Sequence, residues 1–232
     1  MSRRIKRDAD VLLSFFNDYT LSGFCENQDR IKDCRTLHKK LYAIMVFRNE
    51  AINFERHFSN EFMNYMDEAI SDLMLSVFSW GQGAYKSAKL HLRCSIENYL
   101  KSLLSITTSD VVFEKRVYLL FENADNDKHF LNPLNKLLLD NLKNSYSALC
   151  AVVHSSPTER APINAIKYLP SYNKESSRAF VSQFCSVLNS FLEITFLHYH
   201  VMIHEMHPEN KQDFVIALTP TAIKNITEHL YQ

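Results

Sequence analysis

Residues 28–80 read QDRIKDCRTLHKKLYAIMVFRNEAINFERHFSNEFMNYMDEAISDLMLSVFSW, without a glycine or a proline. Apolar side chains recur in this stretch every three or four residues, as at Leu37, Leu41 and Ile44. That spacing places the apolar side chains on one face of an α-helix. The stretch therefore predicts two long helices, or one long bent helix, with a break near Asn49 or Ser59.

The same period continues through most of the chain. Residues 81–83 (GQG) are typical of a turn between helices, and residues 132–133 (NP) and 219–220 (TP) are typical helix starts. Pro208 should end the long helix that precedes it. We expect helices over 1–25, 28–80, 84–106, 111–121, 132–153, 174–206 and 219–232, with loops at 123–128 and 155–173. This pattern predicts a single all-α domain over residues 1–232, a bundle of about seven helices.

The composition supports a helical fold and excludes several classes of protein. Only 3 of the 232 residues are glycine and 6 are proline, whereas tight-turned sheet proteins and nucleotide folds with glycine-rich loops need more glycine. The chain is 46% hydrophobic and 22% charged, so it can bury a core and is not disordered. Its formal net charge is zero, which argues against binding duplex DNA through bulk charge.

The cysteines and the N-terminal segment indicate where the protein resides. The five cysteines are widely spaced and form no CxxC pair, so we expect neither a zinc framework nor a disulfide scaffold, but reduced thiols in the cytoplasm. The first seven residues are basic, and the apolar stretch of residues 11–16 is too short for a signal peptide. No uninterrupted apolar run approaches the roughly 18 residues of a spanning helix, so we expect a soluble protein without membrane contact.

Two groups of basic residues could contact phosphates. The N-terminal run contains Arg3, Arg4, Lys6 and Arg7, which could bind phosphates or form a solvated terminus. Within residues 84–106, basic and acidic side chains four residues apart share one stripe of the helix, so intrahelical salt bridges are expected on a solvated face. The members of this stripe are Lys89, Arg93, Glu97 and Lys101.

Histidines near the end of the 174–206 helix suggest a weaker alternative, a helical metal-binding protein. At 100° per residue, Glu193, His200, His204 and His207 fall within an arc of about 60°, whereas His198 points elsewhere. His200 and His204 are four residues apart, a spacing that allows two imidazoles to share a metal ion. Apolar side chains interrupt the arc, however, and we expect no metal and no cofactor.

Two segments resemble HEPN-superfamily domains. Residues 88–104 (AKLHLRCSIENYLKSLL) place Arg93 and Glu97 four residues apart before a leucine-rich run, and residues 146–156 (YSALCAVVHSS) place His154 at a helix end before small polar residues. The resemblance covers about residues 84–155. It implies a HEPN-like helical core there, flanked by helices over 8–80 and 174–232. HEPN domains occur in toxin–antitoxin, abortive-infection and other antiviral systems, and many are metal-independent RNases that dimerise around two Arg-(4 to 6 residues)-His motifs.

The chain departs from that motif at its arginine. Leu149, Ala148 and Ser147 occupy the positions where the family's arginine would precede His154. In the RNase mechanism, the histidine transfers protons and the arginine holds the phosphate. Of that pair, the chain therefore retains only the histidine.

Two functions follow from the resemblance and its departure. The first is a non-catalytic or degenerate HEPN-like binding module in a bacterial antiviral defence or toxin-related system, which recognises RNA, a nucleotide or a protein partner. The alternative is a metal-independent RNase that uses His154 with Arg93, assisted by Glu97, or His154 with a residue of the proline-rich 155–173 loop. In both cases we expect the helix of Arg93 to pack beside the helix ending at His154, with the 157–170 loop over their cleft. A homodimer or a complex with a protein partner is also expected.

Overall fold

The computed structural model describes residues 2–18, 27–153 and 171–230. Within these ranges the chain forms nine α-helices and three short 3-10 helices and contains no strand, which confirms the all-α prediction. The elements are α1 Arg3–Asp18, α2 Gln28–Ala51, η1 Ile52–His57, α3 Asn60–Gly81, α4 Tyr85–Leu104, η2 Ser109–Phe113, α5 Val117–Asn126, η3 Lys128–Phe130, α6 Pro133–Val153, α7 Lys174–Glu205, α8 Pro208–Val215 and α9 Pro220–Leu230.

Residues 28–80 form two long helices with a break between them, as the sequence predicts. The first helix ends at Ala51, where the chain enters η1. Ser59 is the N-cap of α3, and its hydroxyl accepts a hydrogen bond from the backbone N–H of Phe62 at 3.1 Å. A serine in this position satisfies one of the free N–H groups at a helix start, so it fixes where the second helix begins.

The turn between α3 and α4 also matches the sequence prediction. Gly83 has a φ of 78°, a left-handed conformation that favours glycine. The backbone of Ser171 packs directly against it, and a Cβ at residue 83 would lie 2.4 Å from the Ser171 carbonyl oxygen. The turn thus brings the segment before α7 against the α3–α4 connection.

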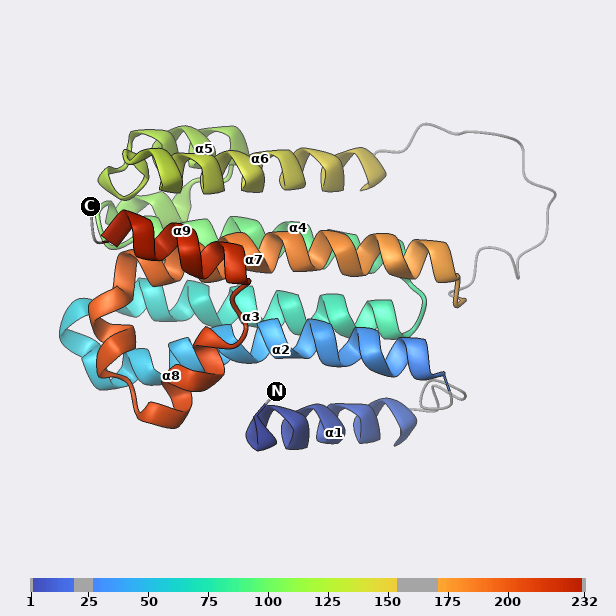
Figure 1. The fold of residues 1–232 in the computed structure, drawn as a ribbon. Helices are drawn as coiled ribbons and strands as arrows, with labels where there is room; N and C mark the ends of the chain where they lie inside the picture. The colour runs from blue at the N-terminus through green and yellow to red at the C-terminus, as the bar shows by residue number, and fades with distance from the viewer. Residues whose placement is uncertain (1, 19–26, 154–170, 231–232) are drawn as a thin grey trace.

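The helices form a bundle in which α4 and α7 occupy the middle (Figure 1). α4 contacts α3, α5, α6 and α7, and α7 contacts α2, α6 and α9. α1 packs on α2 at one edge of the bundle, and α5 and α6 lie at the opposite edge. One continuous hydrophobic core runs between these helices.

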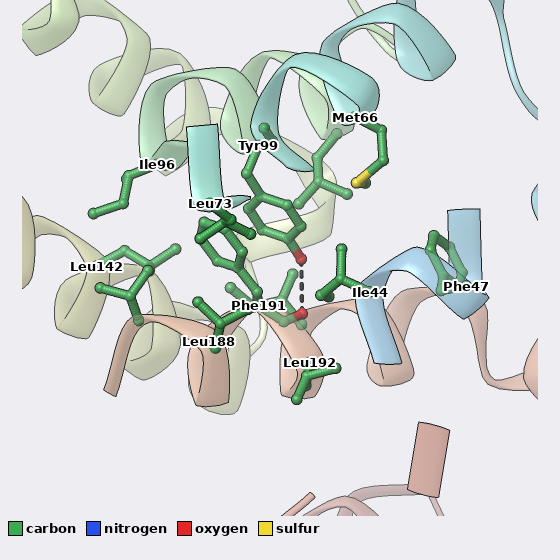
Figure 2. Close-up of a cluster of buried hydrophobic side chains, with 14 of the residues drawn as sticks. Ile44, Phe47, Met66, Leu73, Ile96, Tyr99, Leu142, Leu188, Phe191 and Leu192 are labelled. Atoms are coloured by element: carbon green, nitrogen blue, oxygen red, sulfur yellow. Dashed lines mark hydrogen bonds between the residues drawn. The ribbon is translucent and has the colours of Figure 1, made fainter. Parts of the chain in front are cut away.

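Aromatic side chains join α4 and α7 at the centre of the core (Figure 2). The rings of Tyr99 and Phe191 are stacked with their centroids 3.8 Å apart, and both side chains are fully buried. The Tyr99 hydroxyl donates to the Phe191 carbonyl oxygen at 2.9 Å and also pairs with the Thr195 hydroxyl. Burial raises the pKa of Tyr99, so the phenol stays neutral and keeps this hydrogen bond.

The segment between α4 and α6 differs from the sequence prediction. The predicted helix over 111–121 and loop over 123–128 are wrong, because the α-helix runs from Val117 to Asn126. Of the cap-forming residues 107–110, the first two precede the short η2 and the last two begin it; Val111 and Val112 of η2 are buried. No described side chain caps the start of α5, so the sequence carries no local signal for it.

Two further helices differ in detail. The helix α7 ends at Glu205, just before Pro208, as predicted. Pro208 is also the first residue of α8, which the sequence did not predict. This helix raises the number of described helices above seven. Among the side chains of α1 whose burial the structure describes, Ile5, Ala9 and Leu13 are buried, whereas Val11, in the apolar stretch of residues 11–16, is 64% exposed. The predicted end of the first helix at residue 25 lies outside the described residues, as does most of the 155–173 loop.

The helix α7 is long and apolar enough to span a membrane by length and composition, although polar residues interrupt it and it contains no unbroken apolar run of 18 residues. It is the one helix of this kind among the described residues, and 56% of its most apolar window is buried inside the bundle. Its buried side chains include Phe180, Phe184 and Phe191. This arrangement is typical of the core helix of a soluble helical protein.

Candidate functional site

The seam between α4 and α6 holds Arg93 and Glu97. The two helices lie side by side, as the resemblance implied. The Arg93 Nε lies 3.5 Å from Glu97 Oε1, and the Tyr146 hydroxyl of α6 donates to the same Glu97 oxygen at 2.9 Å. The Arg93 guanidinium also lies over the Tyr146 ring, 5.8 Å from its centroid. One carboxylate thus joins a cation of its own helix to a phenol of the neighbouring helix.

This cluster is partly shielded from water, which strengthens its interactions. The side chains of Arg93 and Glu97 are 22% and 24% exposed. Burial, followed by the hydrogen bond to Glu97, raises the pKa of Tyr146 above its usual range, so the phenol remains a donor. Because Glu97 compensates the charge of Arg93 and Tyr146 covers its face, Arg93 is poorly placed to hold a phosphate.

His154 and the 157–170 loop lie outside the described residues, so the predicted cleft between His154, Arg93 and Glu97 stays a prediction. The described part of α6 shows what surrounds the positions of the missing arginine. Leu149 is fully buried in the core, and Ala148 is exposed. Lys143, on the same helix, donates to both oxygens of Asp125 of α5 at 2.6 and 2.7 Å. This lysine therefore ties α5 to α6.

The stripe on α4 is divided between two roles. Arg93 and Glu97 form the expected salt bridge four residues apart. Lys101 instead donates to the Val112 carbonyl oxygen at 3.1 Å and lies over the Tyr65 ring. The C-terminal part of the stripe thus holds η2 against α4, rather than forming a solvated face.

The histidines of α7 are not gathered into a metal site. No group of three or more His, Cys, Asp or Glu side chains among the described residues could hold a metal ion. The projection of Glu193, His200, His204 and His207 onto one face assumes a continuous helix, but α7 is interrupted at Tyr199 (φ −121°, ψ 28°) and ends at Glu205. The backbone between Glu193 and the histidines therefore departs from 100° per residue, and His207 belongs to the cap of α8.

A basic face is formed by α1 and α2 together. Arg3, Lys6 and Arg7 line an open depression of about 490 Å³ on α1, and Lys32, Arg35 and Lys39 line another of about 270 Å³ on α2. Asp10 lines the first depression and forms a 3.2 Å ion pair with Arg35, which lines the second. The two depressions are therefore neighbours and carry six basic side chains against one acidic side chain.

The sequence prediction found half of this face. It identified the basic run of residues 3–7 but not Lys32, Arg35 and Lys39. The signal for these three was present, because residues 32, 35 and 39 are three and four positions apart and so share one face of a helix. Tyr146 was also missed, although it is the first residue of the 146–156 segment that carries the resemblance.

Removal of the Tyr146 hydroxyl tests the α4–α6 cluster. We expect Tyr146→Phe to lower the free energy of unfolding by about 1–2 kcal/mol, because the half-buried Glu97 carboxylate loses its neutral donor. Urea denaturation measures this loss. Tyr118→Phe is the control, since Tyr118 is 65% exposed, and it should change the stability little. Equal stabilities for the two variants would contradict a role for this hydrogen bond.

Comparison with protein-family models, with curated proteins and with solved structures found no match for the chain.

Proposed function

We propose that this chain is a non-catalytic, HEPN-like RNA-binding module that acts in the cytoplasm, in a bacterial antiviral defence or toxin-related system. The observation that carries the RNA contact is the basic face of α1 and α2, with six basic side chains and one acidic side chain on neighbouring depressions. Clustered lysines and arginines on one face bind phosphates even when the whole chain is neutral. The defence setting rests on the resemblance of residues 84–155 to HEPN domains, and a second copy or a protein partner completes the proposed assembly.

The state of Arg93 favours a binding module over an RNase. An RNase of the resembled kind needs an arginine that is available to a phosphate. Arg93 is held by Glu97 and Tyr146, and a buried leucine stands at one of the positions of the missing arginine. In the proposed role the chain binds RNA without cleaving it, and any cleavage is carried out by another protein.

Charge reversal on the basic face is the direct test of RNA binding. Fluorescence anisotropy with a labelled single-stranded RNA measures the affinity of wild type and of the double variant Lys6→Glu/Lys32→Glu, which changes one exposed lysine on each helix. We expect the variant to lose affinity by about tenfold or more, and the dependence of log K on log salt to become shallower by roughly 0.7 for each lost phosphate contact.

The matched control keeps the net charge of the variant but moves the changes elsewhere. Lys86 and Lys115 are both exposed and lie outside α1 and α2. Lys86 is in α4, and Lys115 lies between η2 and α5. The variant Lys86→Glu/Lys115→Glu should bind RNA nearly as well as wild type. Equal losses in the two double variants would contradict the basic face, as would an RNA affinity that does not depend on salt.

The same RNA distinguishes the RNase alternative. A binding module leaves the labelled RNA intact over the course of the titration. If the protein is instead an RNase that uses His154, the wild type cleaves the RNA and a stably folded His154→Ala variant does not. Cleavage with that dependence on His154 would replace the binding module by the enzyme.

A further inference from the structure

A cavity of about 300 Å³ lies at the end of the bundle where η1 and η3 meet α7. Its lining includes the rings of Phe54, Phe58 and Tyr199 and the imidazoles of His129 and His198. Apolar pockets of this size with a few polar groups are the usual form of a site for a small molecule. The cavity is separate from the basic face and from the seam of Arg93 and Glu97, because none of their residues lines it.

Two helical segments are interrupted at this cavity. Phe54 has φ −117° and ψ 33° within η1, and Tyr199 has φ −121° and ψ 28° within α7. Neither segment contains a glycine or a proline that would explain the interruption. Both non-helical residues line the cavity, so the interruptions shape its wall.

His198 supplies a polar atom that lacks a partner. Its Nε2 is buried and has no hydrogen-bond partner among the described residues. Its ring lies edge-to-face against His129, 4.8 Å between centroids, and against Phe130 at 5.7 Å. Burial, together with the neighbouring His129, lowers the pKa of His198 to about 3, so the imidazole is neutral at physiological pH. A buried polar atom of this kind is normally hydrogen-bonded, and a ligand atom would complete it.

His129 is held in a fixed orientation beside it. The His129 Nδ1 lies 2.6 Å from Asp127 Oδ1, and the His129 backbone N–H donates to the same oxygen at 2.8 Å. The Thr107 hydroxyl donates to the other carboxylate oxygen. Burial would raise the pKa of Asp127, but these hydrogen bonds outweigh it and hold the pKa at about 2. An ionised carboxylate can only accept hydrogen bonds, so Nδ1 of His129 carries a proton and the ring is fixed against Asp127.

We propose that this cavity binds an uncharged aromatic small molecule with one hydroxyl or N–H group, whose ring packs among the aromatic side chains and whose polar group pairs with Nε2 of His198. The ring walls suit a flat aromatic body. A hydroxyl can donate or accept, so it fits either tautomer of His198. The charged side chain at the cavity is Glu205, and no described lysine or arginine lines it, so an anion is disfavoured.

Calorimetric titration with three two-ring probes tests the proposal. We expect 2-naphthol to bind the wild type about tenfold more tightly than naphthalene, which has the same rings without the hydroxyl. We expect 2-naphthoate, which is anionic, to bind more weakly than 2-naphthol. If nothing binds to the wild type, or if 2-naphthol and naphthalene bind equally, the proposal is wrong.

Variants of α7 assign the hydroxyl contact to His198. His198→Phe keeps a ring but removes Nε2, so it should abolish the preference for 2-naphthol over naphthalene while the melting temperature stays close to that of wild type. Val201→Trp, at the exposed rim of the cavity, should block both probes. His204→Phe is the matched control on the same helix and should behave as wild type. A preference for 2-naphthol that survives His198→Phe would overturn the assignment. Lys6→Glu/Lys32→Glu should leave probe binding unchanged, which separates this site from the proposed RNA face.

Discussion

Replacement of Phe191 by alanine should lower the free energy of unfolding by about 3–5 kcal/mol, a large part of the stability of a domain of this size. Phe191 is fully buried and stacks on Tyr99 at 3.8 Å, with the two rings inclined by 14°. Alanine would leave a cavity at the junction of α4 and α7 and would remove the stacking partner of a buried phenol. Neighbouring helices cannot close such a cavity without moving their own packed side chains.

Chemical denaturation of wild type and of Phe191→Ala measures the effect. The control is Phe113→Ala, because Phe113 is 78% exposed and should contribute within about 0.5 kcal/mol. A loss below about 1 kcal/mol for Phe191→Ala would show that α4 and α7 do not pack in this way.

Substitution of Gly83 by alanine should lower the free energy of unfolding by about 3 kcal/mol, because two unfavourable effects coincide. A φ of 78° is strained for any residue with a Cβ. The added Cβ would also lie 2.4 Å from the carbonyl oxygen of Ser171, which is backbone and cannot rotate away. The chain must therefore open the turn or displace the segment before α7.

Thermal unfolding followed by circular dichroism is sufficient to detect this loss. Gln82→Ala is the control in the same turn, since residue 82 has a right-handed helical conformation (φ −77°, ψ −10°) that accepts alanine. A melting temperature for Gly83→Ala equal to that of Gln82→Ala would contradict the close approach of Ser171.

Most of the fold could be predicted from the sequence, because local signals mark most helix ends. Ser59 caps α3, and Pro133 opens α6 at the residue where the sequence places it. The start of α5 could not be predicted, since no described side chain caps it. The cap-forming residues 107–110 lie before or at the start of η2, where they make no side-chain cap either. The interruption of α7 at Tyr199 could not be predicted either, because the helical spacing of apolar residues continues on both sides of it.

The candidate sites were less accessible to sequence reasoning. The pairing of Arg93 with Glu97 follows from a spacing of four residues, so the sequence predicts it. The contact of His129 with His198 depends on how η3 meets α7, and no spacing along the chain encodes a contact between such distant residues. His198 was placed away from the other histidines of its helix, and the structure shows that its partner comes from another element.

The central position of α7 has a consequence for synthesis on the ribosome. The chain leaves the ribosome from its N-terminus, so α2, α4 and α6 are exposed to solvent before α7, which begins at residue 174, can cover them. During that interval α3 and α4 can already pair as neighbours in sequence, but the apolar faces that α7 buries have no partner. The nascent chain therefore passes through a stage in which exposed apolar surface can bind chaperones or aggregate. That stage ends only when α7 packs onto α2, α4 and α6.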